Sequence, residues 1–87
     1  MYQILVVDDE RIERNGIKML LRHMQLPCEI AEAANGRDAL EYLKDHTADI
    51  LLTDVKMPFM DGIQLIEECK KRRQKRGYEM RNFFGLQ

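Results

Sequence analysis

The sequence predicts an α/β protein with a doubly wound parallel sheet, strand order 2-1-3, and three helices. Three short apolar runs alternate with three stretches of helical periodicity, which is typical of this class. The best of these runs is continuously apolar, as strands buried on both faces of a parallel sheet are. Hydrophobic residues make up 45% of the 87 residues and charged residues 33%, a globular composition. Such a length favours one domain or part of one.

Apolar patterning places the first half of these elements. Residues 3–7 form a short apolar run that ends before Asp8, so a buried strand is expected there. A helix is expected next, because apolar residues recur at i, i+3, i+4 and i+7. Its apolar stripe comprises Ile17, Leu20, Leu21 and Met24. Pro27 closes the connection, and a weaker strand is expected at Cys28–Ala33.

The second half continues the alternation. Asn35 suits the N-cap of a second helix, whose apolar stripe comprises Gly36, Ala39, Leu40 and Leu43. Residues 49–53 are expected to form a third strand that ends at Asp54. Asp61 and Gln64 match a capping box at the start of a third helix. That helix carries Leu65, Ile66 and Cys69 on one face.

Charge divides the chain into two parts. Residues 1–69 hold 14 acidic and 7 basic side chains, whereas residues 70–87 hold 1 acidic and 7 basic ones. We therefore expect a domain over residues 1–70 and a basic extension over residues 71–87 that continues the third helix. A nucleic-acid-binding arm is the alternative reading of the basic run, but no aromatic residue interrupts residues 70–76.

Composition also argues against several classes of protein. No apolar run approaches the roughly 18–20 residues of a membrane helix, and no basic region followed by an apolar stretch opens the chain. Cys28 and Cys69 have no CxxC partner, so both are expected to be reduced core residues. These features predict a cytoplasmic protein without membrane contact.

Three carboxylates are expected to meet at one edge of the sheet. Asp8 and Asp9 follow the first strand, and Asp54 follows the third. In a sheet of order 2-1-3 the strand order reverses between those two strands, and ligands bind there. Like charges so close need compensation, and Mg²⁺ provides it while accepting phosphate oxygens. One carboxylate can then act as a nucleophile and form an acyl phosphate. The simpler alternative is that Asp8 or Asp9 only caps a helix.

Three segments resemble the receiver domain of two-component response regulators, a CheY-like family with a flavodoxin-like fold. They are Ile4–Glu10, Asp54–Pro58 and Asp61–Gly62, in the family's order and at its separations. The similarity runs from about residue 2 to residue 70. The stretch between Asp54 and Leu65 is also similar to regulators that carry an AraC-type DNA-binding output domain.

The resemblance implies a role for each site residue. Asp54 would take the phosphoryl group from the phosphohistidine of a sensor histidine kinase, and the chain would not be a conventional enzyme. Asp9 would bind Mg²⁺ directly and Asp8 through water. The main-chain carbonyl of Lys56 would be a further ligand, with Met57 and Pro58 forming the supporting loop. Nucleic acid would be contacted only through an output domain that these 87 residues lack.

The resemblance also implies missing parts. The family's fourth strand ends in Thr or Ser and its fifth in Lys, and both are absent here, so the chain is expected to be a truncated receiver that switches poorly. Residues 77–87 do not match the expected fourth strand. The third strand, with Ile50, Leu51 and Leu52, would then be a bare edge that pairs with a second chain. A homodimer through this edge and the third helix, which could continue into residues 77–84, is therefore predicted.

Two other functions compete with phosphotransfer. Aspartyl-phosphate hydrolases of the haloacid-dehalogenase type carry Asp-x-Asp after the first strand, whereas Asp8 and Asp9 are adjacent here. That spacing argues against the hydrolase. A self-associating interaction fragment without phosphotransfer stays open.

Overall fold

The structure is a computed structural model that describes the backbone of residues 1–76 and 82–86 and the side chains of residues 1–72. Strands and helices alternate along the chain, as predicted. In order they are β1 (Tyr2–Val7), α1 (Arg11–His23), β2 (Cys28–Ala33), α2 (Gly36–Leu43), β3 (Ile50–Asp54), α3 (Gly62–Arg76) and β4 (Asn82–Leu86).

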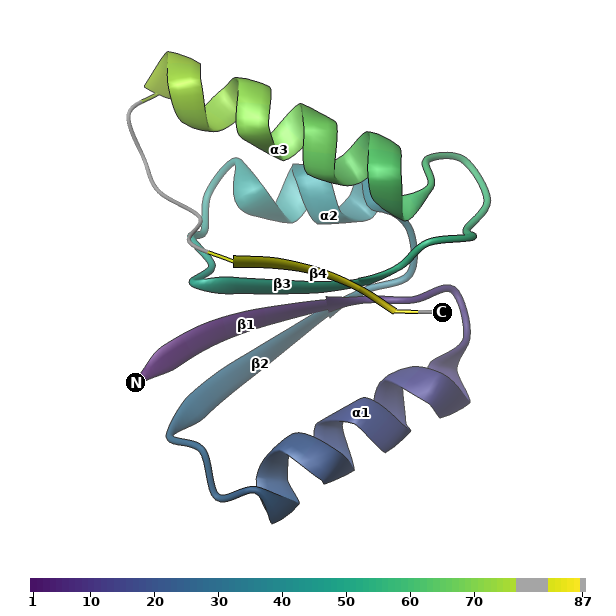
Figure 1. Ribbon diagram of the computed structural model, residues 1–87, viewed down its shortest axis with the longest axis vertical. Coiled ribbons are helices and arrows are strands. Elements are labelled where there is room, and N and C mark those ends of the chain that lie inside the picture. The colour runs from purple at the N-terminus through teal and green to yellow at the C-terminus, as the bar shows by residue number, and fades with distance from the viewer. Residues whose placement is uncertain (77–81, 87) are drawn as a thin grey trace.

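The sheet is parallel, with the order β2-β1-β3-β4, so the predicted order 2-1-3 is confirmed. The register places Val7 opposite both Ala33 and Thr53. The carboxyl ends of the three predicted strands therefore lie together at one edge. Figure 1 shows three layers, with α1 on one face of the sheet and α2 and α3 on the other.

The fourth strand was not expected from the sequence. Asn82–Leu86 pairs in parallel with β3, from Asn82 opposite Ile50 to Leu86 opposite Asp54. The interpretation of residues 82–86 as helix or tail is therefore wrong. The pairing supplies partners for the main-chain N–H and C=O groups along the outer side of β3, which would be costly to leave unsatisfied. The predicted dimer through a bare β3 edge loses its basis, because β3 is paired on both sides.

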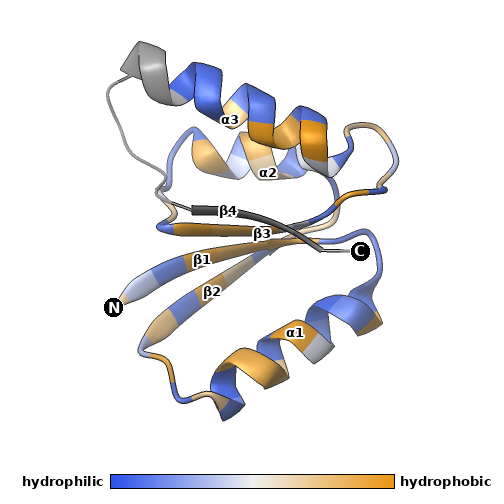
Figure 2. Ribbon diagram, viewed as in Figure 1, coloured by the Kyte–Doolittle hydropathy of each residue, from blue (hydrophilic) through white to orange (hydrophobic). Residues whose placement is uncertain are grey.

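The basic run behaves as predicted over its first part. Helix α3 ends at Arg76, so residues 71–76 do continue the third helix. Figure 2 shows α3 changing from hydrophobic near its start to hydrophilic further along. The predicted continuation of the helix through residues 77–81 lies outside the described residues, as does Gln87. Among the residues that the structure describes, no helix is long and apolar enough to cross a membrane.

Helix starts follow the predicted caps. The Asn35 side chain accepts a hydrogen bond from the Asp38 main-chain N–H at 2.8 Å. Asp61 and Gln64 exchange two hydrogen bonds of 2.8 and 3.1 Å, which completes the capping box. These caps fix where α2 and α3 begin, and so fix the loops beside the carboxyl edge of the sheet.

The core is divided by the sheet. The larger cluster lies between the sheet and the helices α2 and α3, and it includes Leu5, Leu51 and Leu65. The smaller cluster faces α1 and is built on Ile4, Val6 and Leu21. Cys69 belongs to the larger cluster, where burial raises the pKa of its thiol to about 11. Cys28 is only half-buried beside the smaller cluster, and both thiols are free, as predicted.

Candidate functional site

The carboxyl edge of the sheet brings Asp8 and Asp54 together. The register of β1 and β3 sets Val7 opposite Thr53, so the next residue on each strand is an aspartate. Carboxylate oxygens of Asp8, Glu13 and Asp54 all lie within 4.8 Å of one another. Asp8 is buried, Asp54 is half-buried and Glu13 is exposed. The cluster is therefore closed to solvent at Asp8 and accessible to solvent at Glu13.

Asp8 is held by its own turn as well as by the sheet. Its main-chain N–H donates to the carbonyl of Ala33 at 3.1 Å, which extends the β1–β2 pairing. Its side-chain Oδ1 accepts from the main-chain N–H of Glu10 at 2.9 Å. This second bond shapes the turn into α1, in the manner of aspartates in loops. Asp8 therefore supports the turn before α1 and does not cap the helix, whose N-cap residue is Glu10 without a side-chain cap hydrogen bond, so the capping alternative is wrong for Asp8.

Glu13 is a member of the cluster that the sequence prediction missed. It lies in the first turn of α1. A hydrogen bond with Asp8, followed by the negative charges of Asp8 and Glu10, raises the pKa of Glu13 to about 7. Smaller contributions come from burial and from the charge of Asp54. The signal in the sequence was an acidic residue in the first turn of the helix that follows the aspartate pair.

Asp9, by contrast, is exposed and lies outside this three-carboxylate cluster. Its predicted role as a direct metal ligand stays a prediction. Lys56 and Pro58 are exposed on the loop after β3, and Met57 packs against the larger core cluster. Only Met57 of these loop residues therefore anchors the loop through apolar contact.

The loop between β3 and α3 is fixed by a close approach of main chain. Gly62 donates its N–H to the carbonyl of Val55 at 2.9 Å. A Cβ at Gly62 would overlap the main-chain oxygen of Asp54, so glycine is required there. On the other side of Asp54, the hydroxyl of Thr53 donates to that same oxygen at 2.9 Å. The position of the Asp54 main chain is therefore constrained by both Thr53 and Gly62.

The tip of this loop also contacts α2. Phe59 has a positive φ of 72°, and the Arg37 guanidinium lies 5.3 Å from the centre of its ring. A Cβ at Gly36 would lie 2.8 Å from the Cβ of Met60, so the loop packs tightly on the start of α2. These contacts hold the loop that follows Asp54.

A doubly wound sheet with carboxylates at the ends of β1 and β3 defines the class of α/β proteins that bind ligands at the switch point. Residues 4–79 match the response regulator receiver domain. The chain therefore belongs to that family, and the resemblance noted in the sequence is confirmed.

Similar proteins cover most of this chain. The uncharacterized transcriptional regulatory protein YesN of Bacillus subtilis is 42% identical over 69 residues, which are 78% of this chain and 19% of YesN. The chemotaxis protein CheY of Bacillus subtilis is 40% identical over 70 residues, which are 80% of this chain and 58% of CheY. The chain therefore spans less than two thirds of the length of either relative.

Solved structures agree with the fold. A two-component transcriptional regulator AraC from Clostridium phytofermentans superposes with a TM-score of 0.81 at 31% identity, over all of this chain and 68% of that one. The response regulator TrrA from Thermotoga maritima, solved in complex with Mg²⁺ and BeF, gives a TM-score of 0.80 at 25% identity. That match covers all of this chain and 88% of TrrA.

Proposed function

We propose that Asp54 accepts a phosphoryl group from the phosphohistidine of a sensor histidine kinase. The observation that supports this most is the convergence of the Asp8, Glu13 and Asp54 carboxylates at the carboxyl edge of a receiver sheet. An Asp54 oxygen would attack the phosphorus as the phosphorus–nitrogen bond breaks. The electron pair of that bond stays on the imidazole nitrogen, which then takes up a proton, and Asp54 becomes an acyl phosphate.

The residues around Asp54 fit a bound Mg²⁺ ion. Oxygen ligands suit this cation, and carboxylate oxygens of Asp8, Glu13 and Asp54 lie within 4.8 Å of one another. We propose Asp8, Asp9 and Asp54 as its carboxylate ligands, with the main-chain carbonyl of Lys56. When bound, the ion would balance charge on the phosphoryl group in transfer.

The wider setting is proposed from the relatives. Receiver domains take part in two-component signalling, and two relatives are named as transcriptional regulatory proteins. We infer that this chain acts with a cytoplasmic histidine kinase domain. Its output would be an AraC-type DNA-binding domain, as the name of one similar structure suggests.

Signalling by these 87 residues is expected to be weak. The register of β4 sets Leu86 opposite Asp54. The residues of β4, Asn82–Leu86, include no Ser or Thr, so β4 brings no hydroxyl group beside the phosphoryl group. Phosphorylation at Asp54 would then proceed without the contact that, by resemblance, couples it to switching.

The experiment is phosphorylation by acetyl phosphate with Mg²⁺, read by intact-mass spectrometry. The parent chain should gain one phosphoryl group, and Asp54→Asn should gain none. Asp61→Asn is the matched control, since it makes the same change in the neighbouring loop and Asn still caps α3. An adduct of equal yield on Asp54→Asn would place the acceptor elsewhere. A folded parent chain without any adduct would instead favour an interaction fragment that does not take phosphate.

A further inference from the structure

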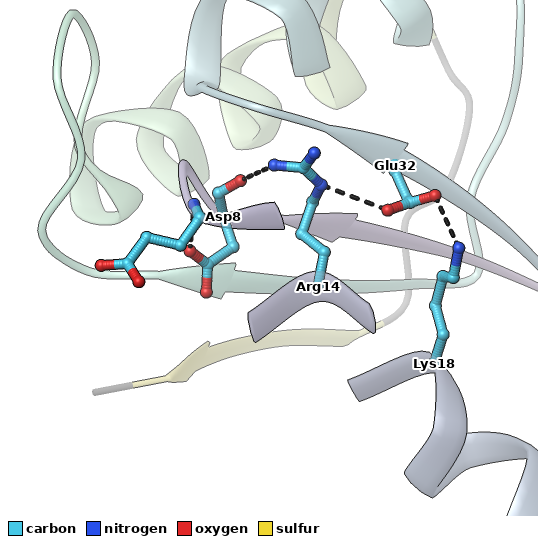
Figure 3. A network of polar contacts seen from close by, with 5 residues as sticks. Asp8, Arg14, Lys18 and Glu32 are labelled. Atoms are coloured by element: carbon cyan, nitrogen blue, oxygen red, sulfur yellow. Dashed lines mark hydrogen bonds and ion pairs between the residues drawn. The ribbon is translucent and has the colours of Figure 1, made fainter. Parts of the chain in front are cut away.

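Arg14 on α1 connects three elements at the back of the site. Its Nη1 donates to the main-chain oxygen of Asp8 at 2.7 Å, and its Nε donates to the Glu32 carboxylate at 3.1 Å. Lys18, one turn further along α1, donates to the other oxygen of Glu32 at 2.9 Å. Figure 3 shows this row of contacts, with Arg14 lying between Asp8 and Glu32.

The arginine is well covered for a charged side chain. Only 15% of its side chain is exposed, compared with 22% for Lys18 and 33% for Glu32. A guanidinium removed from water needs acceptors for its N–H groups and an opposite charge nearby. The carbonyl of Asp8 supplies one acceptor, and Glu32 on β2 supplies the charge. The hydrogen bond from Lys18, and then that from Arg14, lower the pKa of Glu32 against the effect of its partial burial.

Asp8 is consequently fixed at three atoms. Ala33 accepts from its N–H, Glu10 donates to its carboxylate, and Arg14 donates to its carbonyl oxygen. The first two bonds come from neighbouring main chain. The bond from Arg14 is supplied by a side chain to the Asp8 carbonyl oxygen, and it crosses from α1 to the end of β1.

We propose that Arg14 is a positioning residue for the Mg²⁺ site proposed above. It holds the Asp8 carbonyl so that the Asp8 carboxylate faces Asp54. This proposal rests on the proposed function, because it assigns Arg14 a task at the Mg²⁺ site. Groups that orient metal ligands typically change metal affinity by about 10–100-fold when removed. Since Arg14 acts on the main chain of Asp8, we expect the lower end of that range, about ten-fold.

Charge and positioning predict opposite effects, which makes the proposal testable. Removing the positive charge of Arg14 should by itself strengthen cation binding, because like charges repel. Removing its hold on Asp8 should weaken cation binding. Lys18→Met is the control for charge, since Lys18 pairs with the same carboxylate of Glu32 without a bond to Asp8.

A second arginine provides a control for stability. Arg72 on α3 donates its Nη1 to the main-chain oxygen of Leu40 at 3.2 Å, and its Nε lies 3.8 Å from Glu68. The arrangement matches that of Arg14, with one carbonyl and one glutamate, but it joins α3 to α2 away from the site. Arg72→Met therefore removes equivalent contacts without touching Asp8.

The test is a Mg²⁺ titration of the parent chain and four variants followed by backbone NMR, with urea unfolding to confirm that each variant folds. We expect Arg14→Met to weaken Mg²⁺ binding by about ten-fold, with a shifted Asp8 carbonyl carbon before metal is added. Lys18→Met and Arg72→Met should bind as the parent does, or slightly more tightly for Lys18→Met. Arg14→Lys should recover only part of the affinity, because a single ammonium group lacks the planar fork of donors that reaches both partners.

Two results would count against these ideas, and they are distinguishable. A folded parent chain that shows no Mg²⁺-dependent shifts near Asp8, Asp9 and Asp54 would overturn the proposed function before variants are compared. A parent that binds Mg²⁺, together with an Arg14→Met chain that binds it equally well or more tightly, would overturn the positioning role alone. An unchanged Asp8 carbonyl shift in Arg14→Met would also overturn it.

Discussion

The two faces of the sheet are stabilised very differently. The face under α2 and α3 buries a continuous cluster that includes Leu5, Leu51 and Leu65, all with no exposed surface. Among the side chains that the structure describes, the face under α1 buries Ile4, Val6 and Leu21. Alternation along β1 sends Leu5 to one face and Val6 to the other, so both faces receive apolar residues. The two faces differ in how much of their surface the helices cover.

Helix α1 shows the consequence directly. Of its predicted apolar stripe, Leu21 is buried and Ile17 is half-buried, but Leu20 and Met24 are 59% and 56% exposed. The prediction that all four face the core is therefore wrong for two of them. A single helix covers only part of a sheet face, and in the described part of the chain no second helix lies beside α1 (Figure 1).

The largest effect should separate the two faces. Leu51→Ala should cost about 3 kcal/mol of unfolding free energy, because its cavity is closed on all sides. Leu21→Ala should cost about 2 kcal/mol or less, since α1 can shift toward the sheet and water can enter the less completely covered space that Leu21 occupied. Exposed Leu20→Ala should change stability by less than about 0.5 kcal/mol. Urea unfolding followed by circular dichroism measures all three. Equal losses for Leu51→Ala and Leu21→Ala would show that the two faces of the sheet are equally well packed.

Two glycines, one beside the site and one in α1, should respond to alanine in opposite directions. Gly62→Ala, at the start of α3, should cost about 1–3 kcal/mol, because the new Cβ meets the Asp54 carbonyl and the backbone must shift. Gly16→Ala, in α1, should instead gain about 0.5–1 kcal/mol, since nothing lies within 4 Å of its Cβ and alanine favours helix. Urea midpoints measure both changes. A neutral Gly62→Ala chain with unaltered Asp54 amide shifts would show that the loop after β3 is not fixed by close packing.

Local patterns were enough to predict much of the fold and part of the site. The continuous apolar run of β1, the Asn35 cap and the Asp61–Gln64 capping box are all confirmed, because each depends on residues near in sequence. The meeting of Asp8 and Asp54 followed from strand order alone. These features required no knowledge of how distant side chains pack.

Features that depend on distant partners were missed. Residues 82–86 carry a glycine that weakens strand character, and they become a strand only because β3 offers an edge far back in the chain. Glu13 joins the carboxylate cluster because α1 begins at Arg11 and turns that position toward Asp8. Arg14 likewise finds Glu32 across 18 residues of sequence. Sequence spacing alone could not identify Asp8 as the partner of Glu13 or Glu32 as the partner of Arg14.

The smallest expected effect concerns the ion pairs that help hold α1 to the sheet. Folding lowers the pKa of Glu32, chiefly through Lys18 and then Arg14, so the unfolded chain binds this proton more tightly. The pairs should therefore stabilise the fold above the unfolded pKa of about 4.5, and that stability should be lost as the pH falls through the lower folded pKa. Because Glu32 is partly exposed, the effect should stay below about 1 kcal/mol.

A comparison of Glu32→Gln with the parent chain at about pH 7 and about pH 3 tests this. The urea midpoints should differ at the higher pH, and the difference should narrow at the lower one as the parent carboxyl takes up its proton. Glu29→Gln, an exposed change on the same strand, should show no such gap. The gap should also shrink in high salt, because exposed charges are screened. A gap that persists at low pH would mean that Glu32 supports α1 by packing, and that the face under α1 depends less on charge than its contacts suggest.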